Sequence, residues 1–148
     1  MNIIDALLGE HGSIYATMDQ LKTLLASDAS LQACQAALSL FCGVLEDHAR
    51  VEEAILFPAL DQFPQLKQGP LHVMQVEHET IDEIIAFLRR ETDADKLREI
   101  CSEFFELISS HFTKEEEALF PMSQNFLAAE QLDEFGRQWA VRRKVSLI

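Results

Sequence analysis

Apolar residues recur every three or four positions along four long stretches of the chain, which is the pattern of amphipathic α-helices. These stretches cover about residues 2–25, 31–58, 70–90 and 93–121. Residues 27–30 supply capping side chains before the second stretch, Pro70 suits a first helical turn, and Asp93 is a plausible cap for the fourth helix. Four long helices with short connections predict an all-α fold, an antiparallel up-down four-helix bundle.

Proline residues and polar runs mark the connections. Pro58 and Pro64 indicate where the second helix winds down, and Gln62–Gly69 is the expected crossing loop between the halves. After Pro121, which occupies the place of Pro58 in the second half, residues 130–145 form a shorter amphipathic segment. We expect this C-terminal helix to pack across the bundle or against another subunit, which makes it the candidate contact for an oligomer.

The length of 148 residues suits one domain with a single good core. We therefore expect one domain over residues 1–148, with the bundle at about 2–128 and the short C-terminal helix at about 130–145.

Polar residues interrupt the inward face of each long helix. The inward row of the second helix reads Leu38, Phe41, Leu45, His48, Glu52 and then Ile55 or Leu56. His11, His78, His111 and Glu115 hold similar positions on the other three helices. A histidine and a carboxylate on a buried face must be paired or bound to metal, because an unpaired buried charge costs about several kcal/mol.

The same sequence surrounds these polar positions twice. Residues 48–58, HARVEEAILFP, and residues 111–121, HFTKEEEALFP, share six of eleven residues without a gap. In each window a glutamate follows a histidine by four positions, which puts both side chains on one helix face. Upstream of each window the chain reads Glu-His-x-x-Ile, at 10–14 and at 77–81. The ligand candidates are three in each half: His11, His48 and Glu52, then His78, His111 and Glu115.

Four imidazoles and two carboxylates are too many ligands for one tetrahedral zinc ion. They suit two metals of octahedral preference that share the carboxylates, and nitrogen and oxygen ligation without thiolate favours iron first and manganese second. Two iron ions are therefore the expected cofactor.

Composition limits the partners. A formal charge of −13 repels nucleic acid and anionic membrane surfaces, so we expect neither as a partner. The sequence has no apolar run of 18 residues and no basic, apolar leader at Met1, so the expected location is the cytoplasm. The three cysteines lie far from any Cys-x-x-Cys spacing and are expected to be small buried hydrophobes.

Over about Asp5–Leu127 the doubled Glu-His-x-x-Ile and His-x-x-x-Glu-Glu-x-x-Leu-Phe-Pro signatures resemble the hemerythrin-like, or HHE cation-binding, family. The resemblance implies a non-haem di-iron protein. It implies that His11 and His48 serve one iron and that His78 and His111 serve the other. Glu52 and Glu115 would bridge both irons beside an oxo or hydroxo bridge.

Two positions depart from the oxygen-carrying members of that family. Those proteins have a fifth histidine four residues after the third and a bridging aspartate five residues after the last, where this chain has Asp82 and Glu116. The chain is similar instead to the four-histidine, two-glutamate branch that includes iron–sulfur-repair proteins. An open position on each iron favours reaction with O2, peroxide or nitric oxide over reversible oxygen carriage, with a protein electron donor as the implied partner. Whether the protein turns over as an enzyme is left open.

Several neighbours of the candidate ligands are expected to play other roles. His72 is predicted to be a surface histidine, and Glu53, Glu116 and Glu117 to be outward-facing charges. Glu10 and Glu77 are expected to be solvated, with acceptance of a hydrogen bond from an imidazole as the alternative. Tyr15 either shapes access to the site or belongs to the core, Phe57 and Phe120 pack the bundle, and Gly12 serves close packing.

Three other functions compete with a reactive di-iron protein. The first is a metal- or oxygen-sensing module that folds and unfolds with its metal and performs no turnover. The second is a ferritin-like oxidase, which usually pairs Glu-x-x-His at three-residue spacing, whereas the order here is histidine then glutamate at four. The third is a bundle whose histidines only hydrogen-bond to glutamates, and the doubled pattern argues against it.

Overall fold

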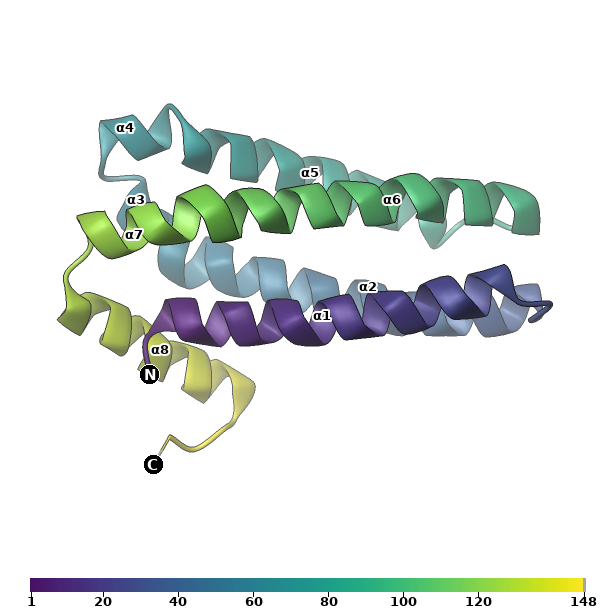
Figure 1. Ribbon diagram of the computed structural model, residues 1–148, viewed down its shortest axis with the longest axis horizontal. Helices are drawn as coiled ribbons and strands as arrows, with labels where there is room; N and C mark the ends of the chain where they lie inside the picture. The colour runs from purple at the N-terminus through teal and green to yellow at the C-terminus, as the bar shows by residue number, and fades with distance from the viewer. Residues whose placement is uncertain (148) are drawn as a thin grey trace.

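The structure is a computed structural model that describes residues 1–147, and its architecture is a bundle of four long antiparallel helices (Figure 1). The long helices are α1 (Ile3–Ala26), α2 (Leu31–Val51), α5 (Pro70–Leu88) and α6 (Ala94–Lys114). In Figure 1, α1 and α2 form the lower pair and α5 and α6 the upper pair. The predicted all-α four-helix bundle is confirmed.

Side chains that precede the helices satisfy their first free N–H groups. The Asn2 side-chain oxygen accepts hydrogen bonds from the backbone N–H groups of Ile4 at 2.8 Å and Asp5 at 3.1 Å. Ser30 caps α2, and Asp93 caps α6 as predicted. These caps fix where α1, α2 and α6 begin, whereas α5 has no side-chain cap and begins with Pro70, which has no N–H to satisfy.

Helices α2 and α6 continue past Glu52 and Glu115, but the turn that begins at each glutamate contains one residue more than a regular α-helical turn. The π-helical segment η1 (Glu52–Leu56) continues α2, and η2 (Glu115–Leu119) continues α6. The first turn closes with a bond from the Phe57 N–H to the Glu52 carbonyl, five residues back, in place of the usual four. Each wide turn therefore begins at a candidate metal ligand.

The proline after each wide turn does not end its helix. Regular helix resumes as α3 (Phe57–Leu60) and α7 (Phe120–Phe126), with the proline in the first turn, where a missing N–H is harmless. The helix ends at Leu60, between Pro58 and Pro64, where the sequence predicts that it winds down. The expected crossing loop also contains one helical turn, α4 (Pro64–Lys67).

The predicted C-terminal helix is α8 (Ala129–Arg143), and it packs across α1 beside the N-terminus (Figure 1). Gly136 faces the backbone of Met1 so closely that a Cβ atom there would clash with the Met1 carbonyl oxygen. Close packing in the protein therefore needs glycine at 136. At Gly12, by contrast, an added Cβ would meet no atom within 4 Å among the described residues, so the close packing expected there is wrong.

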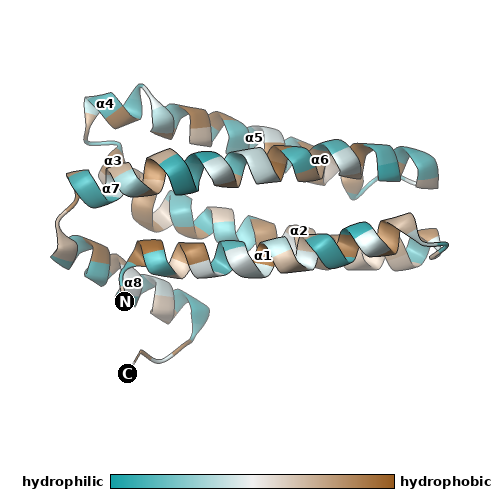
Figure 2. Ribbon diagram, viewed as in Figure 1, coloured by the Kyte–Doolittle hydropathy of each residue, from teal (hydrophilic) through white to brown (hydrophobic). Residues whose placement is uncertain are grey.

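Apolar and polar residues alternate along each long helix (Figure 2), and the buried apolar residues form two clusters. One cluster includes Ile14, Leu38, Phe41, Ile85, Phe104 and Ile108. The other cluster includes Ile3, Leu7, Leu56, Met74, Leu119 and Leu132. His11 lies between Leu7 and Ile14, so a polar layer separates the two clusters. Within residues 1–147 no helix is both long and apolar enough to cross a membrane.

Candidate metal centre

All six predicted ligands lie in this polar layer, and each is at most 4% exposed. They form two groups whose ligand atoms are close enough to hold a metal ion. One group contains His11, His48, Glu52 and Glu115, and the other contains Glu52, His78 and His111. Glu52 belongs to both groups and thus lies between the two candidate positions.

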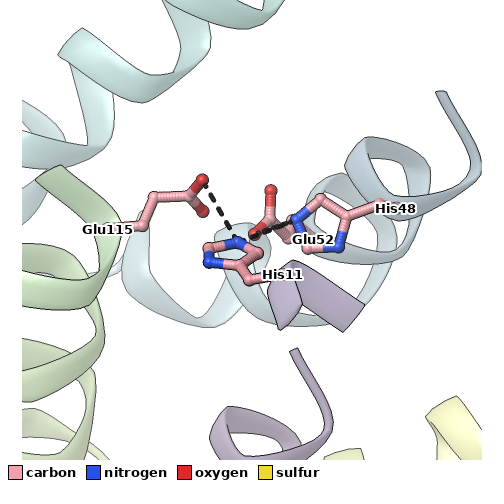
Figure 3. Close-up of side chains that lie close together, drawn as sticks. All are labelled: His11, His48, Glu52 and Glu115. Carbon is pink, nitrogen blue, oxygen red and sulfur yellow. Dashed lines mark hydrogen bonds and ion pairs between the residues drawn. The ribbon is translucent and has the colours of Figure 1, made fainter. Parts of the chain in front are cut away.

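Helices α1 and α2 bring the first histidine pair together (Figure 3). The Nε2 atoms of His11 and His48 are 3.1 Å apart. Two nitrogens bound side by side to an octahedral metal, each at about 2.1 Å, lie about 3 Å from one another. The observed spacing fits two nitrogens that share one metal.

The carboxylates face the Nε2 atoms from the wide turns. One Glu52 oxygen, Oε1, lies 3.2 Å from His48 Nε2, and the other, Oε2, lies 3.2 Å from His78 Nε2. Glu115 Oε1 lies 2.8 Å from His111 Nε2 and 3.8 Å from His11 Nε2. The Glu52 carboxylate therefore spans the two groups with separate oxygens, whereas Glu115 approaches both through the same oxygen.

Glu52 and Glu115 are fully buried, and within residues 1–147 none of their four carboxylate oxygens has a hydrogen-bond partner of acceptable geometry. Leaving buried carboxylates unsatisfied is costly, on the order of several kcal/mol each. A cation between the carboxylates and the imidazoles would remove this cost. The donor set consists of nitrogen and oxygen without thiolate, which suits iron or manganese.

The outer nitrogens of three histidines meet a second layer of carboxylates. His48 Nδ1 lies 3.1 Å from Glu10, and His111 Nδ1 lies 3.1 Å from Glu77. His78 Nδ1 lies 2.9 Å from Glu53. A carboxylate at Nδ1 holds the proton there, and this leaves the Nε2 lone pair free for a metal.

The expectation of solvated side chains is therefore wrong for Glu10 and Glu77, and the expectation of an outward-facing charge is wrong for Glu53. Each carboxylate bonds a histidine on another helix and not its sequence neighbour, so the divergence of adjacent residues on one helix does not exclude the contact. The doubled Glu-His and Glu-Glu pairs were the available signal.

His11 has a weaker outer partner. Its Nδ1 lies 3.4 Å from Glu116, but the two groups are not aligned for a hydrogen bond. Tyr15 donates its hydroxyl proton to Glu116 at 3.0 Å. Glu116 is only partly buried and lies on the outer side of the His11 ring, and Tyr15 supports that side. The neighbouring Glu117 is exposed as predicted, and so is His72.

The four histidines divide into two that favour protonation and two that resist it. Burial opposes the charge on His48, but Glu52 and Glu10 outweigh it and raise the pKa of His48 to about 9. Burial likewise opposes charge on His78, but the Glu52 carboxylate 3.2 Å away and the bond to Glu53 raise its pKa to about 9. Two of the candidate nitrogens therefore carry protons at neutral pH that a metal would displace.

The other histidine of each pair, His11 or His111, has a lowered pKa. Burial and the nearby charge of His48 lower the pKa of His11 to about 3. Burial and the charge of His78 lower the pKa of His111 to about 4. The carboxylates also diverge, because burial and the charge of Glu52 raise the pKa of Glu115 well above its usual range. These shifts keep His11, His111 and Glu115 neutral in the metal-free protein, which reduces the number of buried charges in the polar layer.

Packing around the imidazoles differs between the halves. The Phe112 ring stacks on His11 with 3.7 Å between ring centroids and 7° between planes. The repeat places Ala49 where Phe112 stands in the second window. Beside Ala49 lies a small cavity of about 10 Å³. It is lined by the rings of His48, His78 and His111. Phe57 and Phe120 pack near His78 and His11, as predicted.

The cysteines take no part in this centre. Cys34, Cys42 and Cys101 are buried free thiols, as expected. Burial raises the pKa of Cys42 to about 12 and that of Cys101 to about 11, which keeps both thiols protonated and unreactive.

Comparison with known proteins gives one family and one similar fold. A family model described as the hemerythrin HHE cation-binding domain matches residues 2–123 and, a second time, residues 69–139, so the second match covers the second helix pair. A crystal structure of a hemerythrin HHE cation-binding domain-containing protein from Mycobacterium kansasii has a TM-score of 0.79 to this fold. The two chains are 20% identical, over 97% of this chain and 86% of that chain. No curated protein matches the chain.

Proposed function

Because the chain belongs to the hemerythrin HHE cation-binding domain family, we propose that it is a non-haem di-iron protein that binds or reacts with O2, peroxide or nitric oxide. Its role would be in redox or stress chemistry or in iron handling. The single observation that carries this proposal is the pair of buried carboxylates, Glu52 and Glu115, whose oxygens lack hydrogen-bond partners among the described residues while imidazole nitrogens face them.

The residues divide into two sets of metal ligands. His11 and His48 would hold one iron, His78 and His111 would hold the other, and Glu52 and Glu115 would link them. Two protein nitrogens and two carboxylate oxygens leave part of an octahedral shell free on each metal. When bound, an iron pair supplies electrons to a ligand such as O2, and manganese could occupy the same donor set.

The protein's own contribution is to shape the space beside the imidazoles and to orient their rings. The cavity beside Ala49 has space for about one water molecule and is otherwise lined mainly by apolar side chains, including Leu45, Ile81 and Ile85. A diatomic molecule fits such a space, whereas a larger substrate does not. Glu10, Glu53 and Glu77 meanwhile hold the imidazoles in the orientation that metal binding needs.

The proposal extends to the location, the partner and the domain organisation. Buried free thiols suit a reducing compartment such as the cytoplasm. Repeated reduction of the iron pair requires an electron donor, for which a redox protein is the natural class. Packing of α8 on α1 supports one domain over residues 1–148.

A sensor without turnover is the second candidate. The observation that favours it is the polar layer between the two apolar clusters, because loss of metal would leave buried charges in the middle of the bundle. Circular dichroism of chelator-treated protein distinguishes the candidates. A large loss of helix on metal removal would support the sensor, whereas a fully folded metal-free protein would count against it.

The main test is metal content together with an ultraviolet-visible spectrum of iron-replete protein. We expect about two irons per chain with oxo-bridge absorption, and loss of that absorption in His111→Ala and Glu115→Ala. The exposed His72→Ala serves as the matched control and should retain both metals. Absence of stoichiometric metal from the wild-type protein would overturn the proposal. Nitric oxide titration of the reduced protein then tests the ligand class.

A further inference from the structure

The outer carboxylates Glu10 and Glu77 occupy equivalent positions in the repeat but are held by different elements. Lys114 holds Glu77 through an Nζ–Oε2 contact of 2.6 Å, and Lys114 lies on α6, the same helix as His111. Glu10 is held from α8, which lies outside the repeat. Trp139 Nε1 donates to Glu10 Oε2 at 3.1 Å, and Arg143 donates to the two Glu10 oxygens at 2.8 and 3.1 Å.

Undocking of α8 would therefore affect the two carboxylates unequally. Glu10 takes part in four side-chain hydrogen bonds, of which one is to His48 and three come from α8. Glu77 has its bonds to His111 and Lys114 and none of them involves α8. Without α8, Glu10 could turn to solvent, and His48 would lose the carboxylate that fixes its proton on Nδ1.

The same helix also forms one wall of a groove on this side of the centre. A groove of about 450 Å³ between α1, α2 and α8 is lined by Glu10, His48, Trp139 and Arg143. Gly136 lets α8 approach the N-terminal backbone, and the α8 residues Leu132 and Ala140 are buried. The docked position of α8 thus holds the carboxylate that orients the His48 ring and shapes the groove in front of it.

We propose that α8 is a latch that sets the metal occupancy of the His11–His48 position independently of the His78–His111 position. The inference rests on the proposed function, because it requires two metal positions in the chain. Linkage makes the effect reciprocal: a metal bound by His11 and His48 must stabilise the docked α8 by the same factor by which docked α8 strengthens metal binding. A partner or modification that displaced α8 would release one metal and leave the other.

The test uses two variants that disturb the latch differently. Arg143→Ala removes two of the hydrogen bonds to Glu10, and Gly136→Leu displaces α8 without changing any residue that contacts Glu10. Manganese(II) binding to the metal-free full-length chain, followed by electron paramagnetic resonance, counts the sites and their affinities. We expect one site to weaken by about 10- to 100-fold in each variant and the other to stay within about threefold of wild type.

Two control variants locate the effect. Arg142→Ala removes an exposed neighbouring charge of α8 and should leave both sites unchanged. Lys114→Ala should weaken the other site, so that Lys114→Ala with Arg143→Ala weakens both. The fluorescence of Trp139, the one tryptophan of the chain, reports whether α8 has moved.

The outcomes separate the two levels of the argument. If wild-type protein binds fewer than two manganese ions, the proposed metal pair is wrong and the latch falls with it. If wild type binds two ions and Arg143→Ala weakens neither site, or weakens both equally, the metal pair stands and the latch is overturned. Should Gly136→Leu fail to fold, Arg143→Ala decides the question alone.

Discussion

The two helix pairs of the bundle present the same three side chains inward, yet what supports these side chains differs. In the first half, Glu10 is held by α8, which lies outside the repeat, and in the second half Glu77 is held by Lys114 of the ligand helix itself. The inner ligands must match because both halves face one small space. Residues behind them need only hold an imidazole in place, and several different arrangements can do that.

A similar contrast applies to the outer carboxylates Glu53 and Glu116. Arg50 forms an ion pair with Glu53 at 3.0 Å and binds Asp82 with two hydrogen bonds, whereas Glu116 receives one bond from the neutral Tyr15. Tyr15 and Asp82 occupy the same place in the repeat, four residues after a ligand histidine. Asp82 is thus engaged by an arginine, and the position of a fifth histidine in oxygen carriers has a structural role in this chain.

The largest effect is expected from the carboxylate that the two halves share. Glu52→Ala should lower the affinity of both metal positions by at least about 100-fold, because one Glu52 oxygen faces each group. Glu115→Ala should weaken the His11–His48 position more, since Glu115 belongs to that four-residue group. Isothermal titration with manganese(II) measures both variants. Equal loss at both positions in Glu115→Ala would show that the two carboxylates are equivalent.

Packing differences should change stability next. Phe112→Ala removes a buried ring from the stack on His11 and should lower the free energy of unfolding by about 3–5 kcal/mol. The reverse change, Ala49→Leu, should cost about 1–3 kcal/mol and slow nitric oxide binding by filling the cavity. Urea denaturation of metal-free protein measures both. Leu40→Ala, at a position 76% exposed, is the control and should change stability by less than about 0.5 kcal/mol.

Opposite pKa shifts within each histidine pair predict a maximum in the stability of the metal-free protein near pH 6.5. The raised pKa values of His48 and His78 add stability below 6.5 that is lost as the pH rises toward 9. The lowered pKa values of His11 and His111 remove stability as the pH falls below 6.5. The loss from pH 6.5 to 9 should be on the order of 1–3 kcal/mol.

In the presence of metal, the stability of the protein should instead rise between pH 6.5 and 9. Metal binding displaces the protons of His48 and His78, and it therefore strengthens as the pH rises. Urea denaturation at pH 6.5 and 9, with and without manganese(II), compares the two states. A metal-free protein whose stability rose between these pH values would contradict the assignment of the protonated histidines.

The smallest effect is expected from the hydrogen bond that the uncharged Tyr15 hydroxyl donates to Glu116. Tyr15→Phe removes the hydroxyl bond, and Glu116 can then turn toward His11 Nδ1, 3.4 Å away. We expect metal affinity at the His11–His48 position to change by less than about fivefold, or roughly 1 kcal/mol. A change beyond tenfold would mean that the tyrosine itself, and not only Glu116, orders the site. Glu116→Gln tests the carboxylate directly.

The sequence was sufficient to predict the bundle and the six residues that converge inside it. Apolar spacing placed His48 and Glu52 on a buried face, and the repeat paired them with His111 and Glu115. Both features depend on local periodicity, which a helix converts directly into direction. Whether these six residues bind metal stays a prediction until metal content is measured.

Contacts across the bundle were harder to predict. Glu10 reaches His48 from another helix, and its contacts with Trp139 and Arg143 join residues 129 and 133 positions apart. No periodicity relates such distant positions, and a lone tryptophan has no repeat partner for comparison. The wide turns were hidden for a different reason, because apolar residues at both Ile55 and Leu56 suit either a regular or a widened helix.

Those wide turns also shift the phase of the helices that contain them. A regular helix advances about 100° per residue, so the extra residue in η1 and in η2 rotates everything that follows by about that angle. Phe57 and Leu60 are buried in this rotated frame. Closing the turn as regular helix without removing a residue would direct the downstream apolar face toward solvent, whereas removing one residue, such as Ala54, would close the ordinary turn and keep that face inward. At these two places the number of residues, more than their identity, therefore decides whether the turn is wide or regular, much as a translated message depends on its reading frame.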